Sequence, residues 1–266
     1  MFLQNFWQDY FVALIITTLP ALVLLLLFFF RDKIKEPFSM VISTFAMAFI
    51  ITLPLDFFIQ IVDPLLLALF DNQYYYSFQA FFRAAFLEEF LKFSVLYYYV
   101  SRHHEFDEFV DGIVYGAAIG LGYAVAENMG YLYFFKTDNL TNLAYYRLQP
   151  MIVHIIFGIT MGILFSKSAF QIIKNNIGIY LALFLPVFMH GIHNYSISAN
   201  EIPKLSNIFF WFAIIAILYF LSSLPSLRKI YREKPKIILS NFLFLKVSTS
   251  ALLFSIALSI VFGMIN

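Results

Sequence analysis

The sequence predicts an all-α fold, a polytopic membrane bundle of about eight transmembrane helices. Of the 266 residues, 62% are hydrophobic and 12% are charged, whereas soluble domains are close to half apolar and a quarter charged. Apolar tracts of about 20 residues, enough to cross a bilayer core of roughly 30 Å, recur along the whole length. No polar stretch could form a separate soluble domain, so residues 1–266 are expected to form one integral-membrane domain.

The expected spans follow one another with short polar connections. They cover residues 7–30, 39–60, 78–100, 110–135, 148–166, 177–197, 207–225 and 239–264. The N-terminal tract lacks the basic region and cleavage site of a signal peptide, and is therefore expected to remain as the first span. Segment 61–77 has two interpretations, because it could extend the second helix past Pro64 or lie flat at the membrane interface.

Lysine and arginine are distributed unevenly between alternate connections. Eleven of the seventeen lie in one set of connections, 31–36, 101–109, 167–176 and 226–238. Three lie in the other connections, and three lie inside spans: Arg83, Lys92 and Lys246. Because cytoplasmic loops carry the excess of Lys and Arg, both termini are expected on the extracytoplasmic side of a cell membrane.

Two further features of composition exclude other classes of function. The chain contains no cysteine, which excludes disulfides, thiolate metal ligands and a cysteine nucleophile. Its net charge of +1 gives no basic surface for nucleic acid. The expected partners are therefore the lipid bilayer and other membrane proteins.

Polar side chains at membrane depth gather in the third to sixth spans. They are Glu88, Glu89, Lys92, Glu127, Asn128, His154, His190, His193 and Asn194. Ionisable residues in a bilayer usually mark a functional site or an internal pair. At about 1.5 Å per residue, four of them lie roughly 9–15 Å below the outer ends of their spans: Glu88, Glu127, His154 and His190. One site in the outer half of the membrane is predicted, within a catalytic core at about 78–197.

Helical spacing assigns neighbours within each span. Glu88 and Lys92 are i,i+4 and could form an internal ion pair, whereas Glu89 points about 100° away from Glu88. His190 and Asn194 are also i,i+4 and share a face.

Glycine forms a ridge in the fourth span. Gly112, Gly116 and Gly120 repeat at every fourth position, which lets another helix approach closely. Glu127 lies on the same stripe and is expected to be buried against protein.

The site residues admit two hydrolytic mechanisms. Two imidazoles and a carboxylate match a His₂Glu zinc site with an open position for water. Without a metal, a carboxylate could take the proton from water while His and Asn donors hold the developing oxyanion. The chain contains no helical H-E-x-x-H and no G-x-S-x-G motif, so zincin and α/β-hydrolase interpretations lack support.

These motifs resemble the PrsW family of intramembrane proteases, which is related to the CAAX prenyl endopeptidases and the bacterial CPBP proteins. The resemblance covers about residues 80–197 and rests on "EEFLK" (88–92), "DGIVYGAAIGLGYAVAEN" (111–128), His154 and "HGIHN" (190–194). The CAAX-type pattern has an arginine at the position of Phe93, so Lys92 is the PrsW-like form. Of the two histidines in the last motif, only His190 satisfies the H-x-x-x-N spacing.

The resemblance implies a peptidase that cuts in or beside the transmembrane helix of a single-span protein, such as a membrane-bound anti-sigma factor, at the outer face. It implies Glu88 as the base that activates water, with Glu89 and Lys92 orienting and balancing charge. It implies that Glu127 and His154 assist or bind metal, and that His190 with Asn194 binds metal or holds the oxyanion. A zinc site would then consist of Glu127, His154 and His190, and a metal-independent glutamate mechanism is the alternative.

Two other classes of function compete with the peptidase. One is a non-catalytic membrane scaffold, as in the distantly related scaffold subunit of γ-secretase, although a scaffold has no need of the whole polar set. The other is a proton-coupled transporter, because buried Glu and His also form proton relays. Inverted repeats would favour the transporter, and the two halves show no such symmetry.

Overall fold

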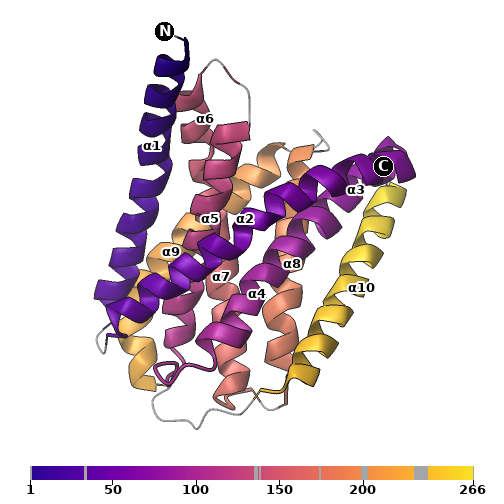
Figure 1. Cartoon of the computed structure of the whole chain (residues 1–266). Coiled ribbons are helices and arrows are strands. Elements are labelled where there is room, and N and C mark those ends of the chain that lie inside the picture. The colour runs from indigo at the N-terminus through magenta and orange to yellow at the C-terminus, as the bar shows by residue number, and fades with distance from the viewer. Residues whose placement is uncertain are drawn as a thin grey trace.

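The computed structural model describes residues 2–32, 35–134, 137, 139–173, 175–198, 203–230 and 239–265, and every regular element among them is a helix. The elements are α1 (Phe2–Arg31), α2 (Phe38–Leu69), α3 (Asn72–Phe78), the π-helix η1 (Gln79–Phe86), α4 (Leu87–Ser94), the π-helix η2 (Val95–Val100), α5 (Asp111–Phe134), α6 (Leu140–Tyr146), α7 (Leu148–Ala169), α8 (Ile177–Ser198), α9 (Pro203–Ile230) and α10 (Asn241–Ile265). The helices pack side by side as one bundle (Figure 1).

Five helical segments of the described chain are long and apolar enough to cross a membrane by length and composition. They are Trp7–Arg31, Phe38–Leu55, Leu140–Ala169, Ile177–Ile197 and Asn241–Met264. The prediction of an all-α membrane protein is confirmed in this form. Three expected spans, 78–100, 110–135 and 207–225, are helical in the described residues but fall outside this set of five. The last contains only a shorter apolar helix, Phe210–Ser223.

The ambiguous segment 61–77 resolves into two helices. α2 continues through Pro64 to Leu69, which is the first of the two expected alternatives. α3 then begins at Asn72, where the Asp71 side chain accepts a hydrogen bond from the Tyr74 backbone N–H and caps the helix.

Helix α5 is the centre of the bundle, and almost all of its side chains are buried. It packs most extensively against α7 and α2. Its predicted glycine ridge is confirmed: a methyl group on Gly112, Gly116 or Gly120 would collide with main-chain atoms of α7. The two backbones therefore touch, as in small-xxx-small packing, and this seam holds α7 and its site histidine close to α5.

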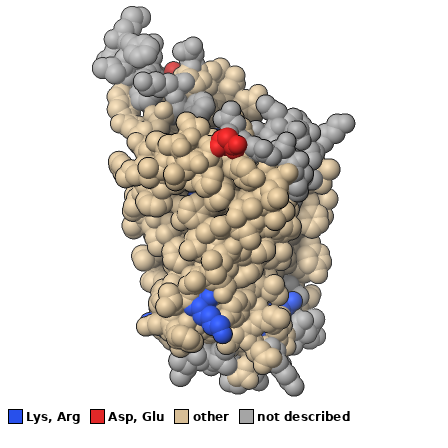
Figure 2. Space-filling model, turned by 90° about the vertical axis from the view of Figure 1, so that its right-hand side faces the viewer, with Lys and Arg blue, Asp and Glu red and all other residues tan. Residues whose placement is uncertain are grey.

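The two ends of the bundle differ in their connections. In Figure 1 the two termini lie toward the upper end, and the described residues of three connections, 31–32 with 35–37, 101–110, and 170–173 with 175–176, lie at the lower end. In the side view of Figure 2, Lys and Arg appear near the lower end, below a broad uncharged band, and Asp and Glu appear near the upper end. The expected alternation of connections agrees with this arrangement; of the connection 226–238, residues 231–238 lie outside the described residues.

Candidate active site

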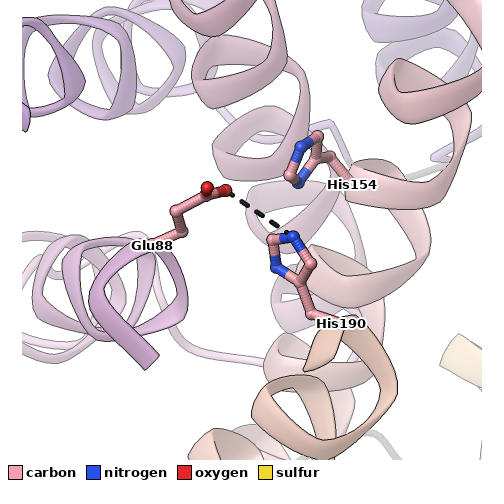
Figure 3. A group of neighbouring side chains, drawn as sticks. All are labelled: Glu88, His154 and His190. Atoms are coloured by element: carbon pink, nitrogen blue, oxygen red, sulfur yellow. Dashed lines mark ion pairs between the residues drawn. The ribbon is translucent and has the colours of Figure 1, made fainter. Parts of the chain in front are cut away.

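Four helices each present one ionisable side chain to a common region inside the bundle. Glu88 comes from α4, Glu127 from α5, His154 from α7 and His190 from α8. Figure 3 shows Glu88, His154 and His190 turned toward one another. These three are buried, and one ligand atom from each lies within 4.8 Å of the other two. The structure thus brings together residues that the sequence places at one depth.

The two neighbouring glutamates have different surroundings. The Lys92 Nζ donates to Glu89 Oε1 at 2.7 Å, and both side chains are fully buried. The expected ion pair between Lys92 and Glu88 is therefore replaced by an i,i+3 pair between Lys92 and Glu89. Glu88 Oε2 is buried without a hydrogen bond, and its nearest ionic contact is His190 Nε2 at 3.8 Å. Glu89 thus holds the positive charge. Glu88 has a side-chain hydrogen bond with Tyr123 of α5, and its Oε2 is left for a bound molecule.

His190 is oriented by a carboxylate and an amide. Its Nδ1 lies 2.8 Å from Glu89 Oε1, and its Nε2 lies 3.1 Å from Asn194 Nδ2. A carboxylate only accepts hydrogen bonds, so Nδ1 carries the proton and donates it to Glu89. The lone pair of Nε2 then faces Asn194 and Glu88, which is the tautomer that metal binding or proton transfer requires.

His154 is held between a lysine and a second carboxylate. Its Nδ1 lies 2.8 Å from Lys92 Nζ, and its Nε2 lies 3.0 Å from Glu127 Oε2. Because an ammonium group only donates, Nδ1 accepts and Nε2 donates to Glu127. The same Glu127 oxygen accepts a hydrogen bond from Arg147 Nη2 at 2.6 Å. Glu127 therefore links His154 to Arg147, a cation that lies outside the expected spans.

Two cavities reach the cluster. One, of about 330 Å³, is lined by residues that include His154, His190, His193 and Asn194. The other, of about 260 Å³, lies against α2 and α5. Both are lined by Arg83, Glu88, Glu127 and Tyr131. Both cavities therefore reach Glu88 inside the bundle.

A π-helical segment places Arg83 beside the site. In a regular α-helix, Arg83 and Glu88 would point about 140° apart at 100° per residue. The i→i+5 bonding of η1 widens the turn, and both residues line the same two cavities. Arg83 also forms an ion pair with Asp63 of α2, from Nε to Oδ1 at 2.9 Å.

The donor set fits a metal ion in type and spacing. Two imidazoles and a carboxylate are the ligands of His₂Glu zinc sites, and the buried, unbonded Glu88 oxygen faces this region. The structure groups Glu88 with the two histidines, whereas the sequence suggested Glu127, which stays a prediction. Both nitrogens of His154 are engaged, so a metal would have to take the place of one of these contacts.

Arg147 is the functional residue that sequence reasoning missed. It donates to Glu127 and, through Nε, to Asn128 Oδ1 at 2.8 Å. It lies just before the expected span 148–166 and was counted as a loop charge. No periodicity could reveal it, because it stands in a short turn between α6 and α7. His193, by contrast, lines the larger cavity but lies outside the group that Glu88, His154 and His190 form among the described residues.

A buried cluster of imidazoles and carboxylates, reached by cavities inside a membrane helix bundle, defines an intramembrane hydrolase. A family model described as PrsW family intramembrane metalloprotease matches residues 36–221. The chain therefore belongs to the PrsW family, as its motifs suggested, and its activity is that of a peptidase.

Relatives of the chain carry the same name. It is 35% identical over 183 residues to Protease PrsW of Geobacillus kaustophilus, covering 68% of this chain and 78% of that one. It is 32% identical over 183 residues to Protease PrsW of Bacillus subtilis, covering 68% of this chain and 80% of that one. No solved structure matches the chain.

Proposed function

We propose that this chain cleaves a single-span membrane protein, in or next to its transmembrane helix, in the outer half of the cell membrane. The observation that carries the proposal is Glu88, a buried carboxylate with an unbonded oxygen beside two histidines and at the meeting point of two cavities. A substrate of the anti-sigma-factor type is the one that the family resemblance implies.

The outer position follows from the topology that we propose. All eight long helical stretches cross the membrane, with the connections rich in Lys and Arg in the cytoplasm and both termini outside. The larger cavity is lined by Pro150 near the start of α7 and by Ile197 near the end of α8. Those helix ends lie at the same end of the bundle as the termini, so the cavity would open toward the outer face.

Metal-assisted hydrolysis is the first mechanism that the residues support. Glu88, His154 and His190 would hold the ion, and a zinc ion would supply a water with a pKa of about 7 and polarise the scissile carbonyl. Glu89 fixes the His190 ring through Nδ1 and is itself held by Lys92. Glu127, which accepts a hydrogen bond from Arg147, is the remaining carboxylate within the site.

A metal-free mechanism uses the same geometry with a different role for Glu88. Glu88 then takes the proton from water, and no ligand set is needed. Asn194 lies beside His190 on α8, and its amide group is a donor for the oxyanion that develops on the scissile carbonyl. His190 would become a second donor only after its Nε2 has accepted a proton. Glu88 would therefore be a metal ligand in the first mechanism and the base in the second.

Cleavage of defined substrates tests the proposal. The purified protein in lipid vesicles is incubated with a set of single-span proteins tagged at both ends, and the products are compared with those of Glu88→Ala and His190→Ala. We expect each substitution to lower the rate by roughly 10²–10⁴-fold, the usual contribution of a positioned acid–base group. Undiminished cleavage by both variants would contradict the assignment.

Metal content separates the two mechanisms. If Glu88 is a ligand, Glu88→Gln lowers the zinc bound per protein molecule as His154→Ala does. If Glu88 is only the base, Glu88→Gln loses activity without a change in bound metal. Activity that survives a strong chelator, in protein shown to be free of zinc, would favour the glutamate mechanism.

A further inference from the structure

The second cavity lies at the lipid-facing edge of the bundle. Besides the four residues that it shares with the first cavity, it is lined by Ile59, Gln60, Tyr123, Gly130 and Phe134. The first two come from α2 and the others from α5. It therefore approaches Glu88 from the side, between two helices, whereas the larger cavity reaches it from the end of the bundle.

The part of α2 that borders this cavity has little protein outside it. Phe57 is 67% exposed, Ile61 64% and Leu65 55%. Large apolar side chains exposed on a membrane helix face the lipid. Gln60 stands among them, is itself exposed, and turns into the cavity lining. A polar residue at this point separates lipid from the path to Glu88.

The chemistry of intramembrane cleavage requires such a space. A peptide bond becomes accessible to attack only when its segment leaves the helix. Non-helical backbone at membrane depth is tolerated only where protein encloses it or a hydrated cavity lines it. A chain that crosses Glu88 therefore needs an enclosed space on both sides of the scissile bond. The two cavities meet at Glu88 and extend from it in different directions, one along α7 and α8 and one along α2 and α5.

We propose that the second cavity receives the unwound segment on one side of the scissile bond, and that the substrate enters it from the lipid between α2 and α5. This inference rests on the proposed function and adds the route of the substrate to it. Water enters through the larger, more polar cavity from the end of the bundle. Gln60 and Tyr131 offer hydrogen-bonding side chains to the exposed backbone of the segment.

Reversible blocking of the cavity tests the route. The chain has no cysteine, so Gln60→Cys introduces a single thiol that a bulky methanethiosulfonate reagent can modify. We expect complete modification to lower cleavage of a single-span reporter at least tenfold, and a reductant to restore it. The matched control is Ile61→Cys, one residue away on the lipid-facing side, where the same modification leaves cleavage unchanged. Full activity of the modified Gln60→Cys enzyme would overturn the proposal.

A second measurement does not depend on catalysis. Benzoylphenylalanine is placed at position 60 or 61 of the inactive Glu88→Gln protein, which is illuminated in vesicles with the same purified reporter. An adduct from position 60 and none from position 61 supports the route. Cleavage of the reporter by the wild-type protein, measured in parallel, tests the proposed function by itself. If the wild type cleaves the reporter but position 60 forms no adduct with it, the proposed route is contradicted and the proposed function is not.

Discussion

Glu88 and Glu89 are adjacent in the sequence, yet the structure gives them opposite tasks. Glu89 is fully buried and contacts Lys92 at 2.7 Å and His190 at 2.8 Å. A charge inside a membrane protein is tolerated when it is paired, so this glutamate balances the lysine and orients the histidine. Glu88 lacks a close ionic partner and lines both cavities. Structural and chemical roles are thus divided between neighbouring carboxylates.

This division predicts opposite effects of two conservative substitutions. Glu89→Gln leaves the Lys92 ammonium buried without its counter-charge, which should lower the free energy of unfolding by about 3–5 kcal/mol. Glu88→Gln removes no close ion pair and should change it by less than about 1 kcal/mol, while cleavage falls by roughly 10²–10⁴-fold. Unfolding in detergent and cleavage of the reporter are measured on both proteins.

A double variant checks the cause of the destabilisation. Glu89→Gln combined with Lys92→Met leaves neither charge buried, so most of the lost stability should return. If the double variant is as unstable as Glu89→Gln alone, the unpaired lysine is not the reason. Equal destabilisation by Glu88→Gln and Glu89→Gln would contradict the division of roles.

Which residues form the site could be predicted from the sequence, but which of them form ion pairs with one another could not. Depth along each span placed Glu88, Glu127, His154 and His190 together, because helical rise is nearly constant. Pairing depends on side-chain direction, and Lys92 has a carboxylate at both i−3 and i−4. The choice of Glu89 follows from the position of His154, which approaches Lys92 from a different helix. Such a contact cannot be obtained from spacing within one span.

At the scale of elements, the seam between α5 and α7 sets the position of His154. Gly116 and Gly158 face each other so closely that a methyl group on either would meet the carbonyl of the other. Gly120 lies against the backbone of His154 itself. Any separation of the two helices therefore moves the histidine away from Glu127.

This contact predicts the effect of one added methyl group. Gly116→Ala should destabilise the protein by about 3 kcal/mol or more, since rigid backbone cannot move aside as a side chain can, and should lower cleavage in parallel. The control is Gly263→Ala in α10, where the added group meets the side chains of Tyr74 and Ser77. Thermal unfolding and cleavage are compared between the two variants. An equal, small effect of both substitutions would contradict the close backbone contact between α5 and α7 as the element that positions His154.

The connection between α1 and α2 carries a carboxyl group with a shifted pKa. Burial raises the pKa of Glu36 to about 7, although hydrogen bonds with Asp111 and Tyr115 oppose the shift. Its Oε2 accepts from the Tyr115 hydroxyl at 2.9 Å, and Asp32 lies in the same group of buried carboxylates. This connection lies outside the spans and ties the start of α5 to α1 and α2.

The raised pKa gives a pH dependence with a definite sign. The folded protein holds the Glu36 proton more tightly than the unfolded chain, whose pKa is near 4.5. The stabilisation is therefore complete below pH 4.5 and is lost as the pH rises toward 7. After allowance for water near the connection, it amounts to about 1–2 kcal/mol. Unfolding measured between pH 5 and 8 should show this slope, and Glu36→Gln should flatten it; the same slope in both proteins would argue against Glu36 as its source.

At the scale of the whole molecule, alternate connections lie at opposite ends of the bundle. This much was predictable, because apolar spans of similar length must alternate in direction. The sequence also places the excess of Lys and Arg at one end, and the structure carries Lys and Arg there (Figure 2). The continuation of α2 past Pro64 to Leu69 could not be predicted from the sequence, because a proline at this position is equally consistent with the end of a helix. The α2 residues that line the second cavity, Ile59 and Gln60, come one turn before Pro64.

The proposed orientation leads to a test that uses the absence of cysteine. His104 and Tyr146 are 80% and 78% exposed and lie in connections at opposite ends of the bundle. With both termini outside, a membrane-impermeant maleimide should label Tyr146→Cys in intact cells and should label His104→Cys only after the membrane is opened. Neither residue touches the site, so reporter cleavage by both variants should equal that of the wild type and shows that they are folded. If His104→Cys is labelled in intact cells and Tyr146→Cys is not, the topology is the reverse of the one proposed. The site would then lie in the cytoplasmic half of the membrane, because the larger cavity is lined by residues at the end of the bundle that carries α6.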